Sequence, residues 1–551
     1  MSGTVGAVAR LVLTTALLLA TTQFVPATAA AIDPPTVDRR VQPRATPIAP
    51  NEPTQRRTLC ARPITARPTS PPAAQKLLNL PAAWKFSRGA GQKVAVIDTG
   101  VSPNKRLTKV IGGGDYVSSG KGLDDCDAHG TLVAGIIAAT PDPGDGFAGV
   151  APEATIIAIR QSSGAYSPTR AKTSVRKGDD DAAVSTGYGT VSTLARAVVR
   201  AVDLGATVIN ISEVACVPAS ETFDDRSLGA AVRYAHRKDV VVVAAAGNLS
   251  TSSQCQTQNP APPVPGYGWD NRAAWKSVVT VASPAWYSPY VLTVGAVKST
   301  DGSPADFSVH GPWVGVAAPG TDIVSLTNAT RGLAGAFRSD DGSIPVQGTS
   351  FAAPYVAGTA ALVRSRFPQL SAAQVIERIM RTAHGSGSGH DVAVGYGVVD
   401  PVAALTTVLP DESDGGGLYT GGNRSFIANS IVIHSGCNPT QGGLVSGDHN
   451  LWDTIPFGPS PGNPNYEGCG VTQPGTLGVP TGVDANLAQN GGPDVQKTYK
   501  LLSGSNAIDT GNASEPGWMI DSLWMSSSSN AWPAVELTST ALAIDVFLPL
   551  P

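Results

Sequence analysis

Three residues, Asp98, His129 and Ser350, have the side-chain types that could act together in nucleophilic catalysis. Asp98 follows an apolar run, His129 opens a segment rich in Ala, Val and Ile, and Ser350 opens a segment of small residues. A serine hydroxyl becomes a strong nucleophile when an imidazole accepts its proton, and a carboxylate can hold that imidazole in the required orientation. These residues are therefore the candidate nucleophile, general base and orienting acid.

Asn248 is the candidate donor to the negative charge that develops in such a reaction. It follows an apolar run, and its side-chain amide could form an oxyanion hole together with the backbone N–H of Ser350. Each of these residues by itself also fits an ordinary turn or helix cap. Their combination indicates a catalytic site, because all four stand where a strand ends or a helix begins.

Short β-branched runs alternate with Ala-rich segments through the middle of the chain. The runs that read as buried strands are 94–97, 156–159, 208–211, 240–244 and 292–294. The segments with helical spacing are 131–139, 191–203 and 228–236. This alternation predicts an α/β fold with a mostly parallel central sheet flanked by helices, in which active sites form at the carboxyl ends of the strands.

The chain has 551 residues, so we expect one large core domain and at least one further unit. Its shares of 42% apolar and 15% charged residues are typical of a globular protein. A formal net charge of -3 provides no electrostatic footprint for nucleic acid, which we therefore do not expect as a partner.

The N-terminal segment, residues 1–30, reads as a signal peptide. Arg10 precedes an apolar run from Leu11 to Ala20, and small residues follow at 27–30, near the expected cut. We therefore expect a secreted protein, extracellular or in the cell envelope. Residues 31–70 form a Pro/Arg-rich N-terminal extension, which must be a linker or an arm on another surface.

The α/β pattern occupies residues 71–409, and a polar inserted loop interrupts it at 161–190. A loop of this length is usually functional or disordered, and this one could cover a cleft. Residues 411–551 form a separate Gly/Asn-rich β-rich unit. After Leu409 no apolar run has the length of a membrane span, so no span is expected after the signal peptide.

The segment 71–409 resembles the subtilisin-like serine peptidases, or subtilases. The resemblance rests on the motifs Val96–Gly100, His129–Gly135 and Gly348–Pro354, which follow one another in the order Asp, His, Ser. It implies a subtilisin-like fold and an endopeptidase that cleaves protein or peptide substrates through an acyl-enzyme. It also implies the catalytic and oxyanion roles described above.

Within that family the chain is most similar to the mycosins, subtilases associated with mycobacterial type VII secretion. The segments Asp124–His129, Asn210–Cys216 and Ser350–Tyr355 carry this similarity. It implies restricted processing of secreted proteins, with the type VII secretion machinery as a partner. It further implies an N-terminal extension that wraps the catalytic domain.

The chain contains six cysteines, an even number that fits an oxidising compartment. Their spacing alone permits fifteen pairings. Pairing of neighbours favours Cys60 with Cys126, Cys216 with Cys255 and Cys437 with Cys469, and the similarity to mycosins implies the first two bonds. No C-x-x-C or H-E-x-x-H motif occurs, so we expect no metal and no cofactor.

Ser212, Glu213 and Val214 stand where subtilisins usually have a Ser-Leu-Gly strand that lines the substrate cleft. They are the candidate substrate-binding residues, and Glu213 and Val214 predict a narrow pocket rather than broad specificity. The extension before Pro71 is short for a separately folding inhibitory propeptide. Activation by removal of a pro-domain is therefore not expected.

The C-terminal segments 429–433, 447–452 and 490–511 resemble the last coils of right-handed parallel β-helix proteins. Asn and Gly accept the unusual dihedral angles that the corners of such coils need. A unit of this kind could contact a glycan or a cell-wall polymer, or it could be a passive spacer.

Two other functions compete with that of a serine peptidase. Asp98-Thr99-Gly100 recurs as Asp509-Thr510-Gly511, and aspartic peptidases use two such loops, but here the copies lie in dissimilar contexts. The other alternative is a catalytically silent subtilase scaffold that acts as a binding or assembly partner of secretion machinery.

Overall fold

The computed structural model of the chain divides into two units, residues 1–407 and 408–551. The structure describes residues 32–409, except 170–182, 185–186, 222, 251–254, 263–265, 268–270, 340–341 and 386–388. After residue 409 it describes only short strands. The expected signal peptide, the pair Cys437 and Cys469 and the second Asp-Thr-Gly motif at Asp509 lie outside the described residues. Among the described helices, none is long and apolar enough to cross a membrane.

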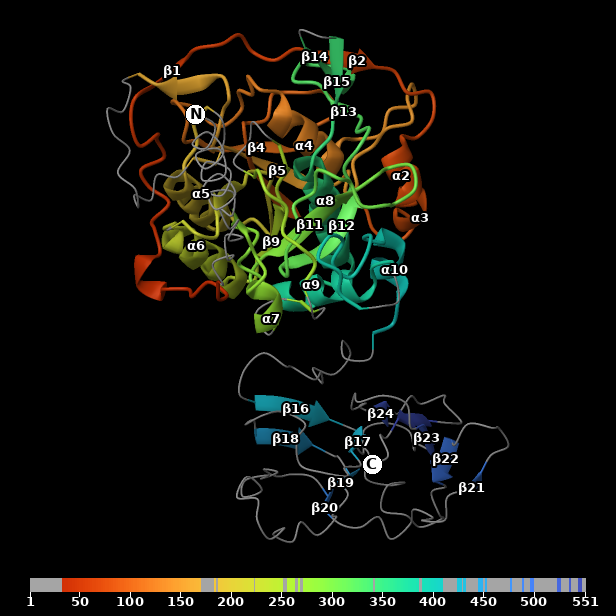
Figure 1. Cartoon of the computed structure of the whole chain (residues 1–551). Coiled ribbons are helices and arrows are strands. Elements are labelled where there is room, and N and C mark those ends of the chain that lie inside the picture. Colours follow the sequence, from red (N-terminus) through yellow and green to blue (C-terminus); the bar gives the residue numbers. More distant parts are fainter. Residues whose placement is uncertain are drawn as a thin grey trace, which may run out of the picture. The chain divides into compact units, whose positions relative to one another are not determined.

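A seven-stranded sheet forms the centre of the first unit, and all its neighbouring strands run parallel (Figure 1). Its spatial order is β12 (Val314–Pro319), β11 (Leu292–Val297), β9 (Val241–Ala245), β7 (Val208–Ile211), β3 (Lys93–Asp98), β5 (Thr155–Arg160) and β4 (Val110–Asp115). The register aligns the last residue of β3, Asp98, with Arg160 at the end of β5.

Helices cover both faces of this sheet because both faces of its strands are apolar. Val94 and Val96 of β3 belong to one core and Ala95 and Ile97 to the other, as the alternation of side chains along a strand requires. The first core contains α4 (His129–Ala138), α8 (Thr349–Arg366), α9 (Ala372–Arg381) and α10 (Pro401–Thr406). The second contains α5 (Val191–Asp203) and α6 (Arg226–Arg237).

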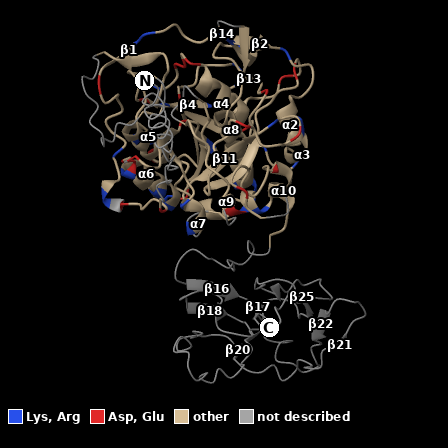
Figure 2. Cartoon of the chain, in the orientation of Figure 1, with Lys and Arg blue, Asp and Glu red and all other residues tan. Residues whose placement is uncertain are grey.

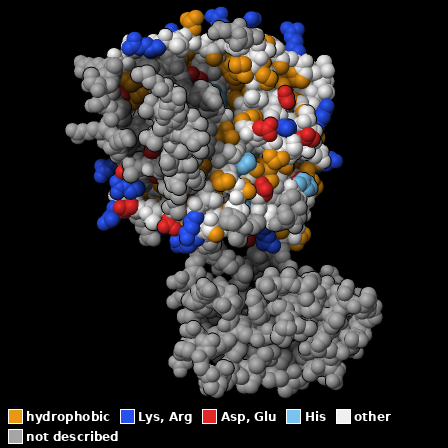
Figure 3. Space-filling model, viewed as in Figure 1, with side chains coloured by type: hydrophobic (Ala, Val, Ile, Leu, Met, Phe, Trp, Pro, Cys, Tyr) orange, Lys and Arg blue, Asp and Glu red, His pale blue; other side chains and the backbone are white. Residues whose placement is uncertain are grey.

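Charged side chains gather away from this core. Figure 2 shows that the described strands and helices at the centre of the first unit are mostly without charge. On the face drawn in Figure 3, acidic and basic side chains of the first unit are interspersed. The described side chains on this face therefore form no patch of a single sign.

Several short elements complete the first unit. Strand β8 (Ala215–Pro218) pairs antiparallel with β10 (Thr280–Ser283), beside the main sheet. The remaining short helices are α2 (Ala73–Leu77), α3 (Leu80–Ala83), α7 (Arg272–Trp275) and the 3-10 turn η1 (Arg39–Val41).

The N-terminal extension lies along the first unit and is attached to it by two strand pairings. Strand β1 (Thr54–Arg56) pairs with β6 (Tyr166–Pro168), inside the segment read as an inserted loop. Strand β2 (Pro63–Ala66) pairs with β14 (Leu333–Ser339), which also pairs with β13 (Ser325–Leu326) and β15 (Gly342–Pro345). The extension is therefore anchored to elements more than 100 residues away in the chain.

The second unit is described only through its strands. These are β16 (Arg424–Ala428), β17 (Ser430–Val432), β18 (Leu444–Asp448), β19 (Leu451–Trp452), β20 (Thr476–Leu477), β21 (Ala488–Gln489), β22 (Gln496–Tyr499), β23 (Leu523–Ser526), β24 (Val535–Glu536) and β25 (Ile544–Phe547). Parallel pairs join β16 with β18, β17 with β19 and β19 with β20, as coils of a parallel β-helix would, whereas β21, β22 and β23 pair antiparallel. The β-helix resemblance stays a prediction.

Candidate active site

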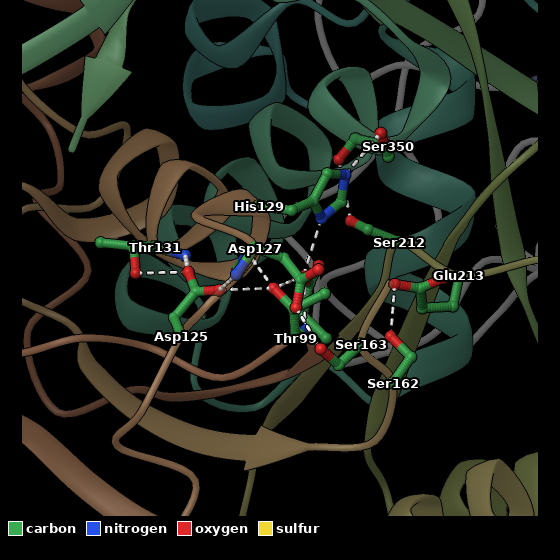
Figure 4. Close-up of polar contacts among 12 residues, drawn as sticks. Thr99, Asp125, Asp127, His129, Thr131, Ser162, Ser163, Ser212, Glu213 and Ser350 are labelled. Atoms are coloured by element: carbon green, nitrogen blue, oxygen red, sulfur yellow. Dashed lines mark hydrogen bonds and ion pairs between the residues drawn. The ribbon is translucent and has the colours of Figure 1, made fainter. Parts of the chain in front are cut away.

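The carboxylate of Asp98 and the imidazole of His129 meet at the carboxyl edge of the sheet. Asp98 is the last residue of β3 and fully buried, and His129 is the first residue of α4. Asp98 Oδ1 lies 2.7 Å from His129 Nδ1 and accepts a second hydrogen bond of 2.7 Å from the backbone N–H of Thr99. Figure 4 shows the imidazole between this region and Ser350. The contact fixes the ring so that its other nitrogen, Nε2, faces Ser350.

Ser350 Oγ lies 2.9 Å from His129 Nε2. Ser350 is the second residue of α8, where unpaired backbone N–H groups converge. With the Nδ1 proton held by Asp98, Nε2 is placed to accept the proton of the serine hydroxyl. Burial of the ring by itself lowers the pKa of His129. The charge and hydrogen bond of Asp98, together with the nearby charges of Glu213 and Asp125, outweigh this effect, so the pKa of His129 is raised overall.

Asn248 lies three residues after β9 and is oriented by the start of α8. Its Oδ1 accepts hydrogen bonds from the backbone N–H (2.8 Å) and the hydroxyl (3.1 Å) of Thr349. A Cβ placed on Gly348 would lie 3.1 Å from Ser350 Oγ and 3.3 Å from Asn248 Nδ2. Because Gly348 has no side chain, a space stays open between the hydroxyl and the amide nitrogen, and a carbonyl oxygen could occupy it.

A buried carboxylate, Asp125, joins the loop after β3 to the start of α4. It accepts hydrogen bonds from the backbone N–H (2.8 Å) and hydroxyl (2.6 Å) of Thr131, and from the Thr99 hydroxyl (2.8 Å). Burial outweighs these bonds and raises the pKa of Asp125 to about 6. Nothing in the sequence alone marks Asp125 as a supporting residue, although the segment Asp124–His129 that contains it carries the similarity to mycosins.

Gly130 is required where these two elements touch. Its N–H donates to the Thr99 hydroxyl at 2.9 Å, and a Cβ at this position would lie 2.1 Å from the carbonyl oxygen of Gly100. Any larger residue would push α4 away from the loop after β3. The close approach of Asp98 and His129 depends on this contact.

An open cleft of about 780 Å³ surrounds these groups. Its lining consists of Thr99, Asp127, His129, Ser162, Gly164, Ala183, Val184, Gly187, Ser212, Glu213, Val214, Ala245, Gly247, Asn248, Cys255, Gln256, Thr349 and Ser350. All three candidate substrate-binding residues are among them. The cleft also includes both described ends of the segment 161–190.

Ser212 is hydrogen-bonded to the backbone of Ser350. Its hydroxyl donates to the backbone carbonyl of Ser350 at 2.8 Å and accepts from the Asn210 amide at 2.9 Å. Glu213 Oε1 accepts from the Ser162 hydroxyl at 2.7 Å. Burial raises the pKa of Glu213 to about 7, and the nearby charge of Asp98 adds to this rise.

Two disulfides brace the neighbourhood of the cleft. One joins Cys60 of the extension to Cys126, three residues before His129. The other joins Cys216 of β8 to Cys255, which lines the cleft. They are the two bonds that the similarity to mycosins implies.

Asp98, His129 and Glu213 each offer one ligand atom, and these three atoms lie within 4.8 Å of one another, a spacing at which a metal could be considered. Both ring nitrogens of His129 already contact other groups, however, one Asp98 and the other Ser350. A metal here would have to displace one of those contacts. The arrangement therefore suits proton transfer between a hydroxyl and an imidazole better than metal binding.

Comparisons with known proteins show which family the chain is similar to. The sequence signature described as the "Subtilase family" matches residues 89–397. Mycosin-4 of Mycobacterium tuberculosis is 49% identical over 383 residues, which cover 68% of this chain and 79% of that protein. Mycosin-1 of Mycolicibacterium smegmatis is 46% identical, with 73% of this chain and 87% of that protein covered.

Solved structures show the same similarity. The crystal structure of MycP1 from Mycobacterium smegmatis is 45% identical, with a TM-score of 0.63, over 69% of this chain and 96% of that one. A chain in the structure of an intact ESX-5 inner membrane complex is also 45% identical, with a TM-score of 0.62, over 69% of this chain and 88% of that one. The predicted subtilisin-like fold with its parallel sheet is thereby confirmed.

Proposed function

Because this chain belongs to the subtilase family of serine peptidases, in its mycosin branch, we propose that Ser350, His129 and Asp98 are its nucleophile, general base and orienting carboxylate. The observation that carries the proposal is the pair of contacts made by one imidazole, 2.7 Å to a buried carboxylate and 2.9 Å to a serine hydroxyl. Asn248 and the backbone N–H of Ser350 are its oxyanion donors.

In the first step Ser350 Oγ attacks the carbonyl carbon of the scissile peptide bond while His129 Nε2 takes the hydroxyl proton. The carbonyl oxygen becomes negatively charged and moves into the space beside Gly348, where Asn248 Nδ2 can donate to it. The C–N bond then breaks, the imidazolium gives its proton to the leaving amine, and an acyl-enzyme remains on Ser350.

Water completes the cycle by the same chemistry. His129 removes a proton from the water as the water oxygen attacks the acyl carbon. The ester bond between that carbon and Ser350 Oγ then breaks, the carboxylic acid product leaves, and the imidazolium returns its proton to Ser350 Oγ. Asp98 stays ionised throughout. Its buried charge stabilises the imidazolium in both steps, which matches the raised pKa of His129.

We place this peptidase in the cell envelope, associated with a type VII secretion system, where it processes a restricted set of secreted proteins. Support comes from relatives: one similar chain belongs to the ESX-5 inner membrane complex, and another is in a structure of the periplasmic assembly from that complex. Glu213 and Val214, in the cleft-lining segment between β7 and β8, are consistent with restricted rather than general proteolysis. The C-terminal unit is proposed as a wall or glycan contact.

The alternative of a catalytically silent scaffold is not favoured. The described nucleophile, base and carboxylate are within hydrogen-bonding distance of one another, and an open cleft leads to them. A silent relative would be expected to have lost at least one of these contacts.

The test compares the wild type with Ser350→Ala in a peptide-cleavage assay. The variant should lose activity by about 10⁶-fold, the loss found on removing the nucleophile of a subtilisin. A fluorophosphonate should label the wild type and leave the variant unlabelled. Equal turnover by both proteins would refute the proposed function, and loss of activity in Asp509→Asn with no effect of the fluorophosphonate would point to an aspartic peptidase.

A further inference from the structure

We propose that Asp127 and Glu213 form an acidic subsite in the cleft, which selects substrates with a Lys or Arg side chain close to the scissile bond. The proposal rests on the proposed peptidase function and adds a substrate class to it. Both carboxylates line the cleft together with His129 and Ser350.

Glu213 lies very close to the catalytic groups. One of its carboxylate oxygens is within 4.8 Å of a ring nitrogen of His129 and of a carboxylate oxygen of Asp98. Asp127 precedes His129 by two residues, and its charge also acts on Glu213. A cation held by these two acids would therefore belong to a substrate residue near the bond that is cut.

The loop after β5 holds both carboxylates in place through two consecutive serines. Ser162 Oγ donates to Glu213 Oε1 at 2.7 Å, and Ser163 Oγ donates to Asp127 Oδ2 at 2.5 Å (Figure 4). The backbone N–H of Ala165 donates to the other oxygen of Asp127 at 3.2 Å. The two acids come from different elements, yet one short segment orients them, and each keeps acceptor capacity for a donor from the cleft.

The described lining of the cleft contains two acids, one histidine and no lysine or arginine. Neither Asp127 nor Glu213 forms an ion pair with a basic residue in the described part of the chain. Acids in a half-buried cleft are usually compensated, because desolvation makes unpaired negative charge costly. A substrate that carries positive charge would supply the missing partner.

The remaining lining suits the shape of a long basic side chain. Ala183, Val184 and Val214 offer apolar surface beside the carboxylates, and Gly164 and Gly187 leave room. Lys and Arg bury their methylene stems on apolar surface while the charged end reaches a polar group. A neutral side chain of the same length would gain the apolar contact but leave the acids without a partner.

The experiment uses matched fluorogenic peptides in which each of the four positions before the scissile bond is Lys, Arg, norleucine or Glu in turn. Norleucine has the four-carbon stem of Lys but lacks the terminal ammonium group, so the ratio of kcat/KM for Lys to that for norleucine measures what the ammonium group adds. Titration of active sites with a fluorophosphonate normalises every protein to its folded, competent fraction. The proteins are wild type, Asp127→Asn, Glu213→Gln, the double variant and Asp124→Asn.

We expect the wild type to prefer Lys or Arg over norleucine, and Glu least, at one or more positions. The preference should fall on the order of tenfold in the double variant, with a smaller fall in each single variant. Asp124→Asn is the control, because Asp124 is 77% exposed, lies three residues from Asp127 and does not line the cleft. It should keep the wild-type preference.

Two results would overturn the subsite: equal cleavage of Lys and norleucine peptides by the wild type, or a preference that persists unchanged in the double variant. Either result leaves the peptidase function intact, provided that Ser350→Ala remains inactive on the same peptides. An active Ser350→Ala would instead refute the peptidase proposal, whatever the peptide preference.

Discussion

Asn248 Oδ1 accepts a 2.8 Å hydrogen bond from the backbone N–H of Thr349, the residue before the candidate nucleophile. An amide whose oxygen is fixed in this way must direct its nitrogen elsewhere, and Asn248 Nδ2 lies beside the open space over Gly348. The donor is thus oriented before substrate arrives, which is what stabilisation of a developing charge requires.

Replacing Asn248 with Leu should lower kcat by about 10²- to 10³-fold, the range found when this kind of donor is removed from a subtilisin. KM should change little, because the bond to the carbonyl oxygen strengthens only as charge develops. Steady-state kinetics with one peptide substrate would measure both. A rise in KM with kcat unchanged would mean that Asn248 binds substrate and does not act on the transition state.

Gly348→Ala should abolish detectable turnover while the protein stays folded. The new Cβ would fill the space between Ser350 Oγ and Asn248 Nδ2, at a residue whose φ is +146°, where L residues are rare. The matched control is Gly342→Ala, because Gly342 has a φ of +129° and nothing within 4 Å of an added Cβ. Similar losses in both variants would show that backbone strain is the cause and that the filled space is not.

The sequence predicted most of the sheet and the central groups of the site, for physical reasons that can be traced. Strand β7 and helix α5 have the predicted bounds, and Thr190 caps α5 with a reciprocal bond to Thr193. Strand β9 starts one residue later than expected, and β11 extends three residues further, to Val297. Periodicity locates such buried elements well but their ends poorly.

Other parts could not be predicted because they depend on long-range contacts. Strand β4 reads Val-Ile-Gly-Gly-Gly-Asp and β12 contains Gly and ends in Pro, so neither resembles a strand by composition. The supporting role of Asp125 arises only when the loop after β3 meets α4. Ser162 and Ser163, which orient the two acids of the cleft, are likewise distant in sequence from Glu213. Ser162 is separated from it by 51 residues.

Asp125→Asn should slow catalysis about tenfold or more by loosening the placement of His129. The amide can accept fewer hydrogen bonds than the carboxylate, so one of the donors from Thr99 and Thr131 would face an NH₂ group. Asp124→Asn, a neighbouring exposed position, is the control and should remain at the wild-type rate. If Asp125 acts on placement, kcat falls while KM for the same peptide changes little; a rise in KM with kcat unchanged would argue against this role.

Glu213→Gln should move the acidic limb of the pH profile of kcat/KM to lower pH, by a few tenths of a unit to about one unit. Catalysis needs neutral His129, and the charges of Asp98, Glu213 and Asp125 all raise the pKa of that ring. Removing one of these charges makes the imidazole easier to deprotonate. Asp127 and Asp98, whose charges act on Glu213, remain in the variant. The charge of Asp98 therefore still raises the pKa of His129. An acidic limb at the wild-type position would mean that Glu213 is neutral when the enzyme works.

Asp225, which does not line the catalytic cleft, allows a prediction about the pH dependence of folding stability. This buried carboxylate accepts hydrogen bonds from the Ser283 hydroxyl, Trp286 Nε1 (2.8 Å) and the Tyr287 hydroxyl (2.7 Å). Burial nevertheless raises its pKa from 3.8 to about 6. Between these two values the unfolded chain has lost the proton and the folded protein has kept it, so folding stability falls as pH rises from 4 to 6, on the order of 3 kcal/mol from this group.

Asp225→Asn removes that titration. At pH 4 the variant should be less stable than the parent by about 1 to 3 kcal/mol, because one of the three donors faces the amide NH₂ group. At pH 7 the difference should shrink or reverse, since the parent then bears the cost of a buried charge and the variant does not. Urea unfolding followed by tryptophan fluorescence, with both proteins in a Ser350→Ala background to prevent self-cleavage, would measure the two differences. An identical difference at both pH values would show that Asp225 does not titrate within the folded protein over this range.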